Sequence, residues 1–206
     1  TRAVGAPAEG PARRSTRHVW ASGRHVHPGR AAVERLFGVG YQLSRVRDLS
    51  QPGQFVCAER VTLQGPKGEL KNVVILGPER PECQAEVSLT DAVALGERPP
   101  VRLSGDLEGS PGFTLRYGSR VLHVDRGLIA AKRPTPMTPA AAPRFGVRHG
   151  PTVRLRTLPT PPLVFGDAAV RVGARSAPSG HLDSAAAYAV GVPTGTRRHT
   201  APRARA

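Results

Sequence analysis

The segment GQFVCAERVTLQGPKGELKNVVILG, residues 53–77, decides the class of fold. It contains two apolar runs, FVCAERVTLQ and LKNVVILG, which are joined by a connection that holds Gly and Pro. In this connection Pro66 fixes one backbone dihedral and the flanking glycines relax the others, a composition typical of a turn. Two apolar runs around such a turn predict a pair of adjacent β-strands.

Shorter runs of the same kind occur on both sides of this segment. They include YQLSRV, AEVSL, TVRLRTL and LVFGDAAVRV. Two segments instead predict short helices, PGRAAVERLFGVG at 28–40 and LTDAVALG at 89–96, the second capped by Thr90 or Asp91. The chain has 23 Gly and 21 Pro among its 206 residues, above the usual combined share of about 12%. The fold is therefore predicted to be mainly β, with many short elements.

The chain also contains a weak internal repeat. GRHVHPGRAAVERLFGVG at 23–40 is echoed by KRPTPMTPAAAPRFGVRHG at 132–150, and in both an Arg opens the segment and Phe-Gly-Val closes it. Repetition of a strand-rich unit indicates a duplicated β-barrel or β-sandwich. We expect a first unit at 21–131 and a second at 132–192, the second completed by residues just before Arg24.

Charge and cysteine content narrow the classes of function. The net charge is +15, and much of the excess lies in the two end segments, which we expect to be a disordered basic extension (1–20) and a disordered Arg-rich tail (193–206). We do not expect nucleic acid as a partner. No apolar run reaches the length of about 18 residues that a membrane span needs, and no apolar leader is present, so a cytoplasmic protein is expected. Cys57 and Cys83 lack metal-binding spacing, and a cysteine nucleophile is the less favoured alternative.

The alternating histidines of RHVH are the first candidate for chemistry. If the chain is extended there, His25 and His27 project from the same face and can bind one metal ion. Two unrelated surface histidines are the alternative. Glu86 is a candidate third ligand, but composition alone does not separate it from Glu59 or Glu82. Two histidines and one carboxylate leave a coordination position open, as in catalytic zinc sites.

Two further residues stand in positions where a ligand could bind. Arg80 follows an apolar run in a Pro-rich turn, so it is either a fork for phosphate or a solvated loop charge. His181 precedes a short Ala-rich segment, where it could be a metal ligand or a helix cap.

Several phrases taken together carry a family resemblance. They are RHVH, LFGVGYQL, DLSQPGQF, ERVTLQGPKGELKNVVILGPER, QAEVSLTDAVALG, PPVRLSGDLEGSPG and GLIAAKR. From Ser22 to Val192 the chain resembles the PduL-type phosphate propanoyltransferases, zinc-dependent enzymes of bacterial propanediol degradation. The resemblance implies two similar β-barrel domains, produced by duplication and capped by short α-helices, with two metal ions near their junction. It also implies conversion of acyl-CoA and phosphate into acyl phosphate and coenzyme A.

The resemblance also implies roles for individual residues. These are His25, His27 and Glu86 as ligands of the first zinc ion, Arg80 as the phosphate-binding residue, and Ser22, Arg47 and Leu76 as contacts of coenzyme A. Arg47 stands where the family usually has a lysine. Because coenzyme A and phosphate are polyanions, a basic protein suits both.

The chain departs from the family pattern in its second half. A motif like RHIHM reads RPTPM here, so that Pro134 and Pro136 replace two histidines and only His181 remains of the three ligands of the second metal. Proline offers no side-chain donor, and the second site cannot form as the family builds it. Two functions follow: a phosphotransacylase that works with one zinc ion, or an impaired member with a binding or structural role. The segment 1–20 does not resemble a microcompartment-targeting helix. A homodimer is one possible assembly of the protein.

Overall fold

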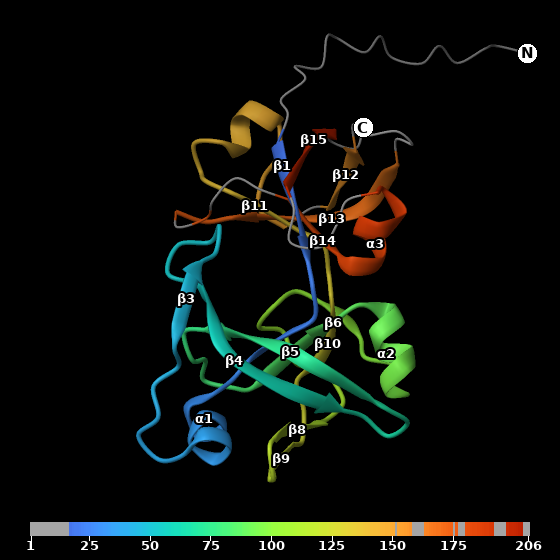
Figure 1. The fold of residues 1–206 in the computed structure, drawn as a ribbon. Coiled ribbons are helices and arrows are strands. Elements are labelled where there is room, and N and C mark those ends of the chain that lie inside the picture. The colour runs from blue at the N-terminus through green and yellow to red at the C-terminus, as the bar shows by residue number, and fades with distance from the viewer. Residues whose placement is uncertain are drawn as a thin grey trace, which may run out of the picture.

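The computed structural model describes residues 17–150, 152–157, 163–174, 176, 180–191 and 197–203, which form two β-sheets (Figure 1). The larger sheet has the order β7-β10-β6-β2-β5-β4-β8-β9, with β3 paired to β4. Its strands are β2 (His25–His27), β3 (Arg45–Asp48), β4 (Phe55–Gln64), β5 (Glu69–Gly77), β6 (Gln84–Val87), β7 (Val101–Arg102), β8 (Phe113–Tyr117), β9 (Arg120–Val124) and β10 (Leu128–Ala131).

The smaller sheet has six strands in the order β11-β13-β12-β15-β1-β14. They are β1 (Arg17–Ser22), β11 (Pro134–Met137), β12 (Thr152–Thr157), β13 (Val164–Val172), β14 (Gly180–Asp183) and β15 (Arg197–Arg203). The helices are α1 (Arg30–Phe37), α2 (Leu89–Leu95), α3 (Ser184–Ala189) and a single 3-10 turn, η1 (Ala142–Phe145). No helix in the described segments is long and apolar enough to cross a membrane.

The predicted strand pair is present as β4 and β5. These strands are antiparallel, with Leu63 opposite Leu70, and the N–H of Gly65 donates to the carbonyl of Gly68 across the turn at 2.9 Å. A Cβ on Gly65 would lie 2.5 Å from the carbonyl oxygen of Leu95, so this close approach requires glycine. The prediction of a mainly β fold with short helices is confirmed.

Each sheet covers its own apolar cluster. The cluster of the larger sheet is built around buried residues of β4, β5, β6 and β8, and Leu36 of α1 and Leu95 of α2 pack into it. Helix α2 begins with a capping box in which Ser88 accepts from the N–H of Asp91. The expected cap, Thr90 or Asp91, is therefore wrong by two or three positions, because the hydroxyl of Ser88 reaches the free N–H groups of the first turn.

The chain crosses between the sheets at two places that matter for the site. β1 of the smaller sheet leads through Gly23 and Arg24 into β2 of the larger sheet (Figure 1). β10 of the larger sheet leads through Lys132 and Arg133 into β11 of the smaller sheet. Each crossing is followed by a short strand and then by a helical element, α1 after β2 and the 3-10 turn η1 after β11, which gives the sequence echo a structural counterpart. The origin of the two sheets as duplicated barrels stays a prediction.

Parts of both end segments form strands. β1 and β15 are antiparallel neighbours in the smaller sheet, with Arg17 opposite Thr200 and Trp20 opposite Arg197. The disorder expected for 1–20 and 193–206 stays a prediction, and residues 1–16, 192–196 and 204–206 lie outside the described residues. Strand pairing uses backbone N–H and C=O groups, which an Arg-rich composition does not remove.

Candidate active site

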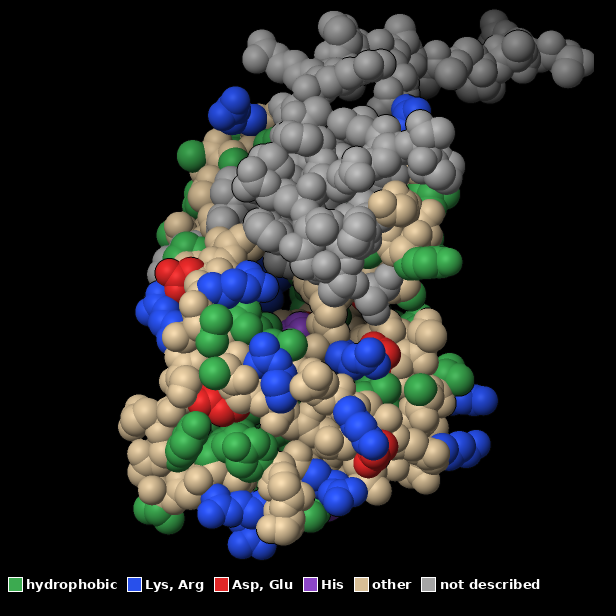
Figure 2. Space-filling view, viewed as in Figure 1, with side chains coloured by type: hydrophobic (Ala, Val, Ile, Leu, Met, Phe, Trp, Pro, Cys, Tyr) green, Lys and Arg blue, Asp and Glu red, His purple; other side chains and the backbone are tan. Residues whose placement is uncertain are grey.

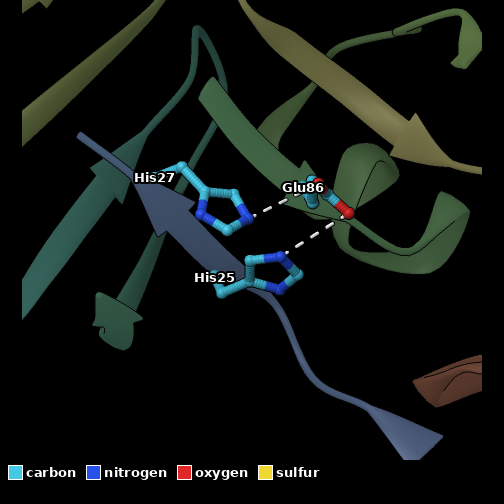
Figure 3. Close-up of side chains that lie close together, drawn as sticks. All are labelled: His25, His27 and Glu86. Atoms are coloured by element: carbon cyan, nitrogen blue, oxygen red, sulfur yellow. Dashed lines mark ion pairs between the residues drawn. The ribbon is translucent and has the colours of Figure 1, made fainter. Parts of the chain in front are cut away.

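The two alternating histidines and Glu86 converge because of strand register. β2 lies between β5 and β6, and in its antiparallel pairing with β6 His25 stands directly opposite Glu86. Opposed residues share a face of a sheet, and so do residues two apart in one strand, which brings His27 to the same face. The three ligand atoms lie within 4.8 Å of one another, and no other such group of three exists among the described residues (Figure 3).

The distances in this group suit one small cation. The Nε2 atom of His25 lies 3.5 Å from one oxygen of Glu86, and the Nε2 atom of His27 lies 3.7 Å from the other. Ligands held tetrahedrally about 2.0–2.1 Å from zinc lie roughly 3.4 Å apart. Two imidazoles and a carboxylate are also the donor set of catalytic zinc sites. These residues therefore fit a metal ion of this type.

The protonation of Glu86 and His27 suits metal binding, whereas that of His25 opposes it. Burial alone would raise the pKa of Glu86, but the two histidines hold that pKa well below its usual range. Burial and the charge on His25 lower the pKa of His27 to about 3. Burial acts to lower the pKa of His25 too, but Glu86 and the carbonyl of Gly23, 2.9 Å from Nδ1, outweigh it and raise that pKa. An ionised carboxylate and a neutral imidazole are the forms that bind metal.

Gln84 holds the carboxylate in place. It is almost fully buried two residues before Glu86, and its Nε2 donates to Glu86 at 2.5 Å. Its Oε1 accepts from the N–H of Gly105 at 2.8 Å. Sequence reasoning missed Gln84, although its position on the same strand face as Glu86 was readable from the period of two.

Arg80 lies beside the same group and is partly buried. One Nη atom donates to the hydroxyl of Ser104 at 2.8 Å, and the other lies 2.9 Å from Nε2 of His27. Burial lowers the pKa of Arg80 and Glu86 opposes that shift, but a guanidinium stays charged. Of the two predicted alternatives, a solvated loop charge is excluded by these contacts.

A cavity of about 890 Å³ opens over these side chains, between the two sheets. Its walls include seven of the residues to which the resemblance assigns a role, namely Ser22, His25, His27, Arg47, Leu76, Arg80 and Glu86. The backbone of His181, in β14, pairs with that of Trp20 in β1, and the side chain of His181 lies outside the described residues. In the space-filling view a histidine side chain is visible in a hollow with Lys and Arg side chains nearby (Figure 2).

Two prolines lie in the wall that the smaller sheet contributes. Pro134 and Pro136 line the cavity from β11, just after the second crossing. His149 and Arg171 also line it, and sequence reasoning assigned neither of them to the site. His149 lies in the segment FGVRHG at the end of the internal repeat, and this repeat was the sequence signal that could have pointed to it.

The alternatives left open by composition are decided by the structure. Glu59 accepts hydrogen bonds from the hydroxyl of Tyr41 and the N–H of Ser44, at 2.8 and 2.9 Å, so it stabilises a loop. Glu82 is exposed and pairs with Arg126. Neither belongs to the metal-binding group.

The cysteines are equally unsuited to nucleophilic chemistry. Burial raises the pKa of both Cys57 and Cys83 to about 11. A thiol with so high a pKa is almost entirely protonated near neutral pH and is a poor nucleophile.

Comparison with known proteins agrees with this arrangement. A family model described as phosphate propanoyltransferase matches residues 18–193. The phosphate propanoyltransferase of Enterococcus faecalis is 52% identical over 183 residues, which cover 89% of this chain and 87% of that protein. Proteins of the same name from Clostridioides difficile and Thermotoga maritima are 46% and 44% identical, each over 86% of this chain and 85% of the relative. The chain therefore belongs to the phosphate propanoyltransferase family of acyltransferases.

Proposed function

We propose that this protein is a phosphate acyltransferase that interconverts acyl-CoA and phosphate with acyl phosphate and coenzyme A, and that it depends on one zinc ion. The acyl group would be propanoyl or a similar short chain. The observation that carries the proposal is the position of Arg80 beside the group of His25, His27 and Glu86, in the wall of one cavity. The names of the relatives supply the reaction.

The metal would be held by those three residues. When bound, zinc supplies a Lewis acid that lowers the energy of negative charge on a nearby oxygen. Glu86 and Gln84 hold their geometry through the hydrogen bond described above, so the ligands are arranged before the substrates arrive.

Arg80 would bind the phosphate. Its guanidinium donates hydrogen bonds to Ser104 and Gln84, at 2.8 and 3.4 Å. Because these bonds already hold the side chain, little side-chain freedom is lost when an anion binds. In the reaction a phosphate oxygen attacks the thioester carbonyl carbon, a C–O bond forms and the C–S bond breaks. Coenzyme A leaves as the thiolate and takes up the proton that the phosphate gives up. Holding both reactants in one cavity removes much of the entropic barrier to their encounter.

Coenzyme A would occupy the remainder of the cavity. Ser22, Arg47 and Leu76 lie in its wall, and Lys132 adds a further cation there. Such a basic wall attracts the phosphate groups of coenzyme A. The proposed role of His181 in binding a second metal stays a prediction, and we propose no second metal site because Pro134 and Pro136 occupy the facing wall.

The alternative is a family member that binds its ligands without efficient turnover. The observation in its favour is that Pro134 and Pro136 line the cavity from the smaller sheet. In the described part of the chain, the group of His25, His27 and Glu86 on the larger sheet is then the candidate for a metal site.

Release of free thiol from acyl-CoA tests the proposal. Zinc-loaded protein is mixed with phosphate and acetyl-, propanoyl- or butanoyl-CoA, and phosphate-dependent thiol release is followed. We expect turnover by the wild type, little by Glu86→Gln, and normal rates for the matched control Glu82→Gln, whose side chain is exposed. Absence of phosphate-dependent release with all three substrates would favour the alternative. A large gain in rate on changing Pro134 and Pro136 together to histidine would show that a second metal limits the reaction.

A further inference from the structure

Arg171 faces the site from the opposite sheet. It lies on β13 of the smaller sheet, where it is the register partner of Pro136 on β11. It borders both the main cavity and an adjoining cavity of about 550 Å³, and the two cavities share His27, Arg80 and Arg171 in their walls. The two arginines therefore border the same space from different sheets.

The two arginines differ in their charged surroundings. Burial lowers the pKa of Arg80, the nearby charge of Glu86 raises it, and the positive charge of Arg171 has a smaller effect that lowers it. Within the described residues, Arg80 bonds only to neutral partners, and Arg171 has no carboxylate within ion-pair distance. Arg133 in the same cavity differs, because Asp167 and Asp183 both pair with it.

Two like charges that face a common space favour an anion between them. Each guanidinium presents a planar fork of N–H donors that matches two oxygens of a phosphate. A phosphate dianion carries enough charge to offset both cations. Arg80 is held by its own hydrogen bonds, whereas Arg171 is exposed and can adjust to the bound anion.

We propose that Arg171 is a second phosphate-binding residue, which holds the attacking phosphate from the smaller sheet while Arg80 holds it from the larger sheet. This inference rests on the proposed function for the identity of the anion. It assigns the phosphate position to the junction of the two cavities, next to the metal-binding group. It also gives the smaller sheet a direct role in binding the substrate.

Binding of inorganic phosphate to the zinc-loaded full-length chain, measured by titration calorimetry, tests the inference. Charge-assisted hydrogen bonds are the strong ones, so Arg171→Ala should weaken phosphate binding about tenfold or more. Arg171→Lys, which keeps the charge but loses the fork, should recover part of that loss. The matched control is Arg154→Ala on β12 of the same sheet, an exposed arginine outside both cavities, and it should bind phosphate as the wild type does.

Kinetics separate phosphate from the phosphate groups of coenzyme A. Arg171→Ala should raise KM for phosphate about tenfold and leave KM for acyl-CoA within twofold. Unchanged phosphate affinity in Arg171→Ala, an equal loss in Arg154→Ala, or an effect confined to acyl-CoA would each overturn the inference. If the wild type binds phosphate through Arg171 but releases no thiol, the proposed function fails, whereas the role of Arg171 in binding phosphate is supported.

Discussion

Replacement of Gln84 by Met is the most informative single change near the metal group. Met has a similar volume, so the core is disturbed little, but the donor to Glu86 is lost. That hydrogen bond is 2.5 Å long and ends on an ionised carboxylate. Loss of such a support to a metal ligand typically lowers metal affinity about 10–100-fold, which is about 1.4–2.7 kcal/mol. The N–H of Gly105, which donates to Gln84 at 2.8 Å, would lose its acceptor as well, at a cost of about 1–3 kcal/mol in folding stability.

Competition with a chromogenic chelator measures the zinc affinity, and urea unfolding measures the stability. The control is Gln64→Met, at the exposed end of β4 and outside the cavities, which should change the zinc affinity less than twofold. Zinc affinity in Gln84→Met equal to that of the wild type would refute the reasoning, because Glu86 would then hold its position without this hydrogen bond.

Three further predictions concern residues around the site. The pKa of Glu59 is lowered because the hydrogen bonds to its carboxylate outweigh the effect of burial. The ionised carboxylate therefore stabilises the folded protein at pH values above the pKa of Glu in the unfolded chain, about 4.3, and this stabilisation is lost as the pH falls through the lower pKa of the folded protein. Thermal unfolding of Glu59→Gln should therefore depend less on pH than the wild type below about pH 5, and an identical pH dependence would contradict this. Cys57 and Cys83, with pKa values of about 11, should react slowly with a disulfide reagent at pH 8 in native protein and rapidly after unfolding, and fast native labelling would exclude this account of their burial. Ser88→Ala, which removes the cap of α2, should lower the free energy of unfolding in urea by about 1 kcal/mol, and no change would show that the capping box is not stabilising.

The local pattern of the chain predicted most of what forms the site. The alternation in RHVH correctly indicated a strand with both imidazoles on one face, because the side-chain period of a strand is two residues. The same period on QAEV carries Gln84 and Glu86 to one face. Only the pairing of β2 with β6, however, brings Glu86 opposite His25, and strand pairing between distant segments is not encoded in the spacing of either one.

The residues that sequence reasoning missed depend on contacts between the sheets. Arg171 lies within a run that reads only as a strand, and its relation to Arg80 follows from where the two sheets face each other. The pairing of β1 with β15 was not predicted, for a related reason. The end segments contain many Arg residues, and composition does not show the backbone pairing that β1 and β15 offer each other.

Formation of acyl phosphate by protein of known metal content tests the central claim most directly. Wild-type protein with one zinc ion per chain, determined by elemental analysis, is incubated with propanoyl-CoA and phosphate and followed by ³¹P NMR. We predict that a new acyl phosphate resonance grows as the phosphate resonance declines. A folded protein with one bound zinc per chain that leaves the phosphate resonance unchanged would contradict the claim that this metal group and Arg80 suffice for acyl transfer.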